Sequence, residues 1–402
     1  MTNSDRTAKW AEKAREEERR EVASLRACLP HPEYHYFLDL LERGVSAGAL
    51  FQRTGKPVVN LLCIQTPLEL IHAAGFLPFK QFSGSYSGAS FAGGLPALMC
   101  PMLQSLLGLM TMRAEDALGI WVLPTTCDWI VKFPEMLSMK GAVPKIHWVE
   151  LPHLKETERG ETLWREEVFR FKTFLETESG RKIRREALRE SVLAYNRAAD
   201  ALSLLEEHRS AGRVPFIWFL AVTNSFFLDS PEHWTDAVLA LVKTLDSKGE
   251  AGKTASARVF LAGSPIFFPG WKLPRLLEEA GLYVCGDDLC SSGRIFPGRV
   301  DLSDESLWGI TAALAERYHH GCLCPTFADN DRRRNSIFSQ KTKAVIYHIL
   351  KGCHPCDIES YTLENALKAR GYRFIRLETG YTAEDSRNLL TRLEAFKQSL
   401  EN

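Results

Sequence analysis

The sequence lacks several features that would place it in a familiar class. Lys+Arg and Asp+Glu balance at 50 residues each, so no net charge favours nucleic acid or an anionic membrane as a partner. No apolar run reaches the roughly 18 residues that a transmembrane helix needs. Residues 1–29 are charged throughout and have no apolar core. We therefore expect no secretory signal, no membrane association and a cytoplasmic location.

A nucleotide-binding motif is also missing. No Gly-x-Gly-x-x-Gly follows a predicted strand. The segment GEAGKT (249–254) resembles the end of a phosphate-binding loop, but it precedes a predicted strand instead of following one, and Ser247 stands where the first glycine belongs. We expect a solvent loop there, and no nucleotide site on this chain.

Cysteine, in contrast, is plentiful, with ten residues. Thiols of a cytosolic protein stay reduced, which favours metal binding or catalysis over disulfides. Six of them are placed by chain order where one buried site would collect them: Cys63, Cys100, Cys127, Cys322, Cys324 and Cys353. Because open α/β sheets build ligand sites at the carboxyl ends of their strands, thiolates gathered there would suit iron–sulfur chemistry.

Short apolar runs alternate with helical patterns along the chain. The predicted strands are 57–63, 77–83, 119–127, 145–152, 258–263, 282–289, 343–350 and 373–379. Strands that alternate with helices indicate mostly parallel sheets. We expect an α/β fold of two doubly wound, Rossmann-like parallel-sheet lobes with a helical N-terminal extension. The expected domains are 1–55 for the extension, 56–210 for the first lobe and 211–402 for the second.

Four further segments have helical patterns. Residues 5–28 and 33–52 are predicted as two helices of the extension, and 160–178 and 181–209 as two long amphipathic helices. We expect these four to pack together around the first lobe or to form a dimer contact.

Three of the cysteines, Cys100, Cys127 and Cys353, stand at strand-to-helix turns, where free N–H groups and the helix dipole stabilise a thiolate. Other interpretations stay open. Any single cysteine can be a small buried hydrophobe, as we expect for Cys28, Cys285 and Cys290, although the Gly/Ser-rich loop of Cys290 could lie near the site. Two further alternatives are a zinc site, from Cys322, Cys324, Cys353 and Cys356, and a thioredoxin-like redox pair in CHPC.

Three other side chains are candidates for catalysis. His354, beside Cys353, could transfer protons. Glu69 could do the same, although an exposed helix carboxylate is the simpler expectation. Lys132 lies about one turn beyond Cys127 and could offset the charge of a cluster, although a solvated lysine is the simpler expectation.

Several segments together resemble the 2-hydroxyacyl-CoA dehydratase and benzoyl-CoA reductase superfamily. In chain order they are PLELIHAAGFLP, LMCP, TTCD, AGSP, GDDLCSSGR, KGCHPCDIES and TRLEAF, across residues 57–396. The resemblance implies an oxygen-sensitive iron–sulfur protein of two α/β lobes, and a separate ATP-hydrolysing iron–sulfur activator that supplies low-potential electrons. The segment after TTCD departs from the family, because Trp129 and Pro134 stand where relatives are often more polar.

The resemblance also implies a ligand set. Cys100, Cys127 and Cys353 match the three cysteines that hold one [4Fe–4S] cluster in this superfamily. Three more match a subgroup called double-cubane cluster proteins: Cys63, Cys322 and Cys324. Members of that subgroup are homodimers that hold an [8Fe–9S] cluster on six cysteines, receive electrons from an ATP-hydrolysing reductase partner, and reduce small molecules.

Three functions follow as hypotheses. The first is a double-cubane reductase of this subgroup. The second is a subunit of a [4Fe–4S] 2-hydroxyacyl-CoA dehydratase or benzoyl-CoA reductase, a heterodimer that works through a ketyl radical of the thioester. The third is an electron carrier or maturation factor without a substrate. The Cys-x-Cys pair at 322 and 324 favours the first, because a protein with a single cluster does not need it.

Overall fold

The computed structural model describes most of the 402 residues. The described ranges are 3–81, 84–91, 99–112, 119–139, 145–248, 257–296, 298–321, 323–326, 330–338 and 342–401. Two features of the sequence, Cys322 and the GEAGKT segment at 249–254, lie outside the described residues.

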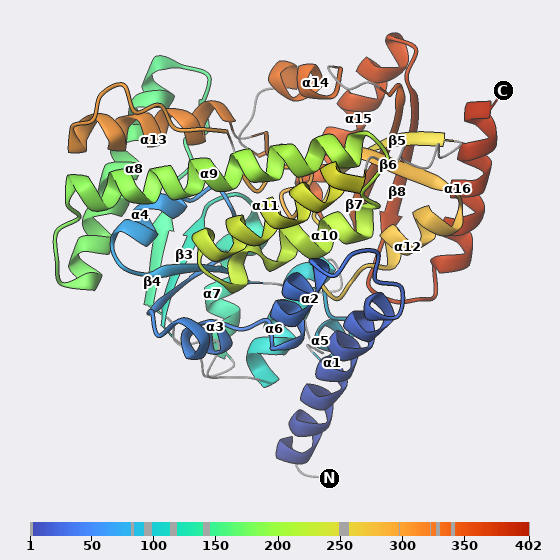
Figure 1. The fold of residues 1–402 in the computed structure, drawn as a ribbon, viewed down its shortest axis with the longest axis horizontal. Helices are drawn as coiled ribbons and strands as arrows, with labels where there is room; N and C mark the ends of the chain where they lie inside the picture. Colours follow the sequence, from blue (N-terminus) through green and yellow to red (C-terminus); the bar gives the residue numbers. More distant parts are fainter. Residues whose placement is uncertain are drawn as a thin grey trace.

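Two parallel four-stranded sheets form the framework of the two lobes (Figure 1). The first has the order β2-β1-β3-β4 and comprises β1 (Val58–Leu61), β2 (Leu77–Lys80), β3 (Ile120–Pro124) and β4 (Lys145–Val149). The second has the order β6-β5-β7-β8 and comprises β5 (Ala257–Gly263), β6 (Leu282–Asp287), β7 (Ala344–Leu350) and β8 (Arg373–Thr379). Each predicted strand is found, and the Rossmann-like α/β fold class is confirmed.

The N-terminal extension differs from the prediction in one place. After α1 (Asn3–Arg26), the segment 33–52 forms two helices, α2 (Tyr34–Glu42) and α3 (Ala47–Thr54). Gly44 lies between them with φ +112°, a backbone angle that L side chains rarely adopt. The Ser46 side chain then caps α3 by accepting from the Ala49 N–H at 3.1 Å. The single helix predicted over 33–52 is therefore wrong, because a glycine turn divides it.

Four helices connect the lobes. They are α8 (Glu158–Ser179), α9 (Arg185–Ser210), α10 (Phe216–Ser225) and α11 (Pro231–Lys248). Helix α8 packs on β4, whereas α9 runs across the molecule and contacts both α4 (Leu68–Ala73) of the first lobe and β6 of the second (Figure 1). All ten residues of α10 are buried, so α10 has no polar face, and the periodicity of its sequence did not indicate a helix.

The remaining helices flank the two sheets. They are α5 (Tyr86–Phe91), α6 (Pro101–Met112), α7 (Asp128–Met139), α12 (Lys272–Glu279), α13 (Leu307–Gly321), α14 (Asn330–Phe338), α15 (His354–Ala369) and α16 (Ser386–Glu401), with a short 3₁₀ turn at Phe226–Leu228. Helix α7 continues through Pro134 and is not broken there.

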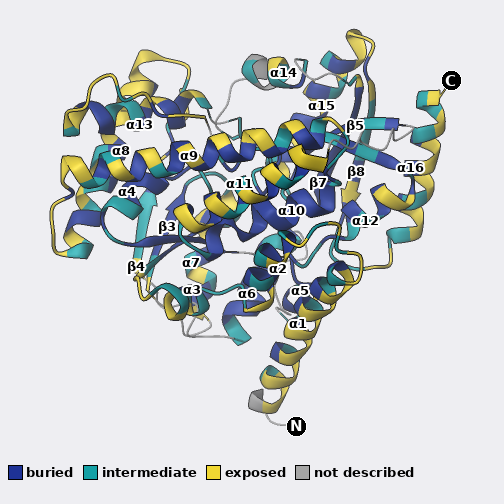
Figure 2. Cartoon of the chain, viewed as in Figure 1, coloured by how far each residue is buried: buried dark blue, intermediate teal, exposed yellow. Residues whose placement is uncertain are grey.

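One apolar core joins the lobes. It contains Val59 and Leu61 of β1 together with Val259 and Leu261 of β5. The inner strands are buried, the edge strands β4 and β8 are partly exposed, and exposed residues follow the outer faces of the helices (Figure 2). Among the described helices, none combines the length and the apolar character needed to cross a bilayer.

Candidate functional site

Three of the predicted cysteines begin helices. Cys100 directly precedes α6, Cys127 precedes α7, and Cys353 is the N-cap residue of α15. Their carbonyl oxygens accept hydrogen bonds from the first turn of the helix, as in Cys127, whose carbonyl accepts from the Ile130 and Val131 N–H groups at 3.0 and 3.1 Å. Each thiol therefore lies where backbone N–H groups and the positive end of a helix dipole favour negative charge.

These three thiols meet across the boundary between the lobes. The pKa of Cys100 is raised to about 12, mainly by burial and in smaller part by the nearby thiols of Cys353 and Cys127. Burial likewise raises the pKa of Cys127 to about 11, with Cys353 again contributing. Cys100 and Cys127 belong to the first lobe and Cys353 to the second, so both lobes contribute to one site.

Two more of the predicted cysteines belong to the same group of thiols. Cys63 lies just after β1, and its pKa is raised, first by burial and then by Cys324 and Cys290. Cys324 also contributes to the raised pKa of Cys127, so it lies near both. The structure thus brings together five of the six predicted thiols, and the sixth, Cys322, is outside the described residues.

Two further cysteines lie at the edge of this group. Cys290 is near Cys63, as its Gly/Ser-rich loop had suggested. Cys356 is buried in the first turn of α15, and its thiol and the Ser264 hydroxyl hydrogen-bond with the Cys353 thiol. The bond to Cys356 is the largest cause that lowers the pKa of Cys353 below its ordinary value. Ser264 was part of the AGSP motif, but its contact with Cys353 follows only from the packing of β5 beside β7.

The spacing of the thiols limits what they can bind. The cysteines in the described part of the chain are free thiols. Within that part, no three thiol sulfurs lie within 4.8 Å of one another. A single zinc ion, with Zn–S bonds of about 2.3 Å, needs closer sulfurs than this. An occupant that holds several metal ions suits wider spacing than one zinc ion does. Cys322, one of the four ligands of the zinc alternative, lies outside the described residues.

The site also contains buried polar groups that call for an occupant. The Tyr381 hydroxyl is buried near Cys100 and has no hydrogen-bond partner among the described residues. The Trp129 Nε1–H group, two residues after Cys127, is buried without a partner in the same part of the chain. Because an unpaired buried donor costs about 1–3 kcal/mol, an acceptor such as a sulfide beside these thiols would relieve them.

Of the three candidate catalytic residues, only His354 lies beside the thiols. It is exposed and begins α15 directly after Cys353. Lys132 is a solvated lysine, with its side chain 61% exposed and paired with Glu135 at 2.8 Å. Another lysine, Lys80, is buried at the end of β2 and close enough to Cys63 to lower its pKa.

Glu69 is not an exposed helix carboxylate, and that expectation was wrong. The residue is 1% exposed and forms a buried ion pair with Arg317 of α13. The Tyr318 hydroxyl also donates to its carboxylate at 3.1 Å. These contacts join α4 to α13, so Glu69 contributes to the packing of the two helices.

The sequence is similar to known proteins over most of its length. The profile of the family described as 2-hydroxyglutaryl-CoA dehydratase, D-component, matches residues 63–400. The chain belongs to this family. The match begins at Cys63 and covers both lobes, so the matched range contains the position of every cysteine in the group of thiols.

Relatives within this family are subunits of dehydratases and of a reductase. The (R)-phenyllactyl-CoA dehydratase beta subunit of Clostridium sporogenes is 22% identical, covering 87% of this chain and 93% of the relative. The (R)-2-hydroxyglutaryl-CoA dehydratase beta subunit of Acidaminococcus fermentans is 23% identical, covering 88% and 94%. A benzoyl-CoA reductase subunit of Thauera aromatica is 25% identical, covering 76% and 80%.

Proposed function

We propose that this chain is an iron–sulfur reductase whose cysteines hold an [8Fe–9S] double-cubane cluster between the two lobes. A separate ATP-hydrolysing iron–sulfur reductase would supply low-potential electrons, a homodimer would be the working unit, and the substrate would be a small molecule. The ligands would be the six cysteines Cys63, Cys100, Cys127, Cys322, Cys324 and Cys353.

One observation supports this proposal above the others. Cys63 and Cys324 lie in the same group of thiols as Cys100, Cys127 and Cys353. A single [4Fe–4S] cluster with three cysteine ligands would leave the thiols of Cys63 and Cys324 beside the cluster with no iron to bind. Two cubanes joined by a bridging sulfide use about six terminal thiolates, which is the number that the sequence offers at this site.

The electrostatics of the site support a cationic occupant. Burial holds the pKa of Cys63, Cys100 and Cys127 above the ordinary value of a thiol, so thiolates there are unfavourable by themselves. Bound iron would stabilise the thiolate form of each ligand. Lys80 adds one buried positive charge near Cys63, which partly offsets the negative charge that several thiolates and sulfides would collect.

The chain's own residues have separate roles in this proposal. The helices α6, α7 and α15 each position the cysteine that stands just before the helix and direct backbone N–H groups to its sulfur. The Leu103 N–H does this for Cys100. The cluster would supply low-potential electrons to the substrate. His354, exposed beside Cys353, is our candidate for delivering protons. Tyr381 is a candidate hydrogen-bond donor to the occupant.

The names of the relatives favour a second function. Each of the three is named as a subunit of a dehydratase or reductase of a CoA compound. In this alternative one [4Fe–4S] cluster is held by Cys100, Cys127 and Cys353, and the thioester is reduced to a ketyl radical in a heterodimer. Cys63 and Cys324 would then be free thiols next to the cluster.

Iron and sulfide analysis of anaerobically purified protein separates the two functions. The double-cubane proposal requires about eight irons per chain, and Cys324→Ala should lower the content toward about four. The matched control is Cys28→Ala, because Cys28 is exposed and outside this group of thiols. A wild-type content of about four irons, unchanged in Cys324→Ala, would overturn the double-cubane proposal and favour the dehydratase alternative.

A further inference from the structure

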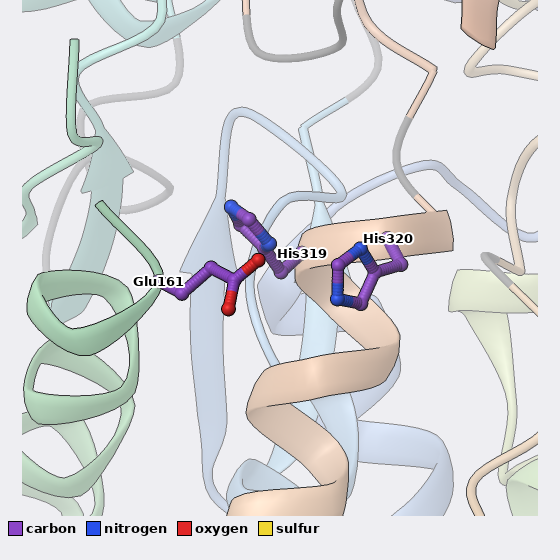
Figure 3. Close-up of side chains that lie close together, drawn as sticks. All are labelled: Glu161, His319 and His320. Carbon is purple, nitrogen blue, oxygen red and sulfur yellow. The ribbon is translucent and has the colours of Figure 1, made fainter. Parts of the chain in front are cut away.

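Two imidazoles and a carboxylate meet at a second place, where the end of α13 lies against the beginning of α8. His319 and His320 are in the last turn of α13, and Glu161 is in the first turn of α8. One ligand atom from each residue lies within 4.8 Å of the other two. Figure 3 shows the Glu161 carboxylate reaching from α8 toward the two rings at the end of α13.

The two helices are held in this position by other contacts. The Trp164 Nε1–H group of α8, 1% exposed, donates to the Ala315 carbonyl of α13 at 2.8 Å. The Thr157 side chain caps α8 by accepting from the Gly160 N–H at 3.1 Å. The three candidate ligands therefore do not need to be gathered by an ion, because the packing of the helices already brings them together.

The three residues differ in burial in a way that suits a metal site. His319 is 2% exposed, whereas Glu161 and His320 are exposed. The backbone of Lys155 lies close to the His319 ring, although burial has the larger effect and lowers the pKa of the ring. The packing around the buried His319 ring limits its orientation, and the two exposed residues leave an entry path for an ion.

The end of α13 is also anchored from a third element. The Arg332 guanidinium of α14 donates to the carbonyl oxygens of His319 and His320 at 3.3 and 2.6 Å, and it pairs with Glu156 at 3.3 Å. These bonds satisfy carbonyl groups that a helix end leaves open. They also keep the backbone of both histidines in place while the side chains face the pocket.

The donor set selects the kind of ligand. The residues line a pocket of about 180 Å³ that also includes Glu316 and Arg165. Two carboxylates beside two imidazoles disfavour an anion, although Arg165 supplies one positive charge. Imidazole nitrogen with carboxylate oxygen suits Zn²⁺ or a similar transition metal, whereas Ca²⁺ and Mg²⁺ prefer oxygen ligands alone. The pocket has room for water to complete the coordination.

We propose that Glu161, His319 and His320 bind one Zn²⁺ ion, separate from the group of thiols. The ion would join α8 to the last turn of α13, only a few residues before Cys324. Its role would be structural, because it would fix the helix end from which that cysteine extends. The proposal does not depend on the type of iron–sulfur cluster, since its ligands are nitrogen and oxygen.

The test uses the full chain, purified anaerobically with its iron–sulfur complement. Zinc is titrated, and the bound metal is counted after dialysis and located in crystals by anomalous scattering at the zinc edge. We expect about one zinc per chain at Glu161, His319 and His320. Glu161→Gln and His320→Ala should each weaken binding by more than the roughly 10–100-fold typical of losing a ligand's supporting partner.

The matched control is Glu158→Gln, because Glu158 is exposed in the same first turn of α8 and outside the pocket. It should bind zinc as the wild type does. Both test positions are exposed, so their variants should fold, and unchanged iron content and circular dichroism would verify this. Absence of bound zinc, equal zinc in Glu161→Gln and Glu158→Gln, or an anomalous peak only at the cysteines would each overturn the proposal.

Discussion

Glu69 provides a sharp test of the structure, because it could be either a catalytic base or half of a buried ion pair. Its side chain and that of Arg317 are 1% and 6% exposed. Glu69→Gln keeps the size of the side chain and removes its charge. The buried Arg317 guanidinium then loses its carboxylate partner, although it still donates to the Gly298 carbonyl at 3.0 Å. Breaking a buried pair in this way costs about 3–5 kcal/mol. We expect the free energy of unfolding to fall by that amount.

Urea unfolding of the anaerobically purified variants measures this cost. The double variant Glu69→Gln with Arg317→Met should lose less than either single variant, because it removes both buried charges together. The control is Arg189→Ala, which breaks an exposed pair with Glu305 and should cost no more than about 1 kcal/mol. If Glu69→Gln is as mild as the control and only activity is lost, the structural interpretation of Glu69 is refuted.

Three further predictions concern the second lobe and its border with the thiols. Burial lowers the pKa of His348 to about 4. Between pH 6.5 and 4 the unfolded chain therefore binds a proton that the folded chain does not. The free energy of unfolding should fall by up to about 3 kcal/mol as the pH drops through that window. His348→Gln should flatten this pH dependence of the urea midpoint, and equal slopes would refute the assignment. Tyr381→Phe should change the free energy of unfolding by less than about 1 kcal/mol, since the Tyr381 hydroxyl has no partner among the described residues. The same variant should lower the midpoint potential of the cluster in a redox titration. An unchanged potential would show that the hydroxyl does not reach the cluster. Gly263→Ala should cost at least about 2 kcal/mol in thermal unfolding, because φ is +107° and a Cβ would lie 2.1 Å from the His348 carbonyl oxygen. The control, Gly371→Ala, has φ +75° and open space around the added Cβ, so it should cost clearly less. Equal costs would contradict the close approach of the His348 carbonyl to Gly263.

The sequence predicted the sheets better than the helices. Buried parallel strands are continuous apolar runs between turn residues, so β7, with all seven residues buried, is visible in AVIYHIL. Helix α10 is also buried all round, and periodicity cannot separate such a helix from other apolar segments. The break at Gly44 depends on a positive φ, which a helical pattern does not reveal.

Within the candidate site, the cysteines could be predicted and their neighbours could not. Chain order relative to strands is enough to suggest that Cys63, Cys127 and Cys353 converge, because parallel strands end at the same edge of a sheet. Which lysine lies beside them depends on the packing of the lobes. Lys132 was the nearer in sequence, yet it is solvated, and Lys80 is the buried one.

In the proposed double-cubane protein, Cys63 and Cys324 bind iron together with Cys100, Cys127 and Cys353. Diffraction from anaerobically grown crystals, with anomalous data at the iron edge, counts the irons and identifies their ligands in one measurement. We predict about eight iron positions in two linked groups, with the sulfurs of Cys63 and Cys324 bonded to iron. A single group of about four irons, with Cys63 and Cys324 as free thiols, would contradict it.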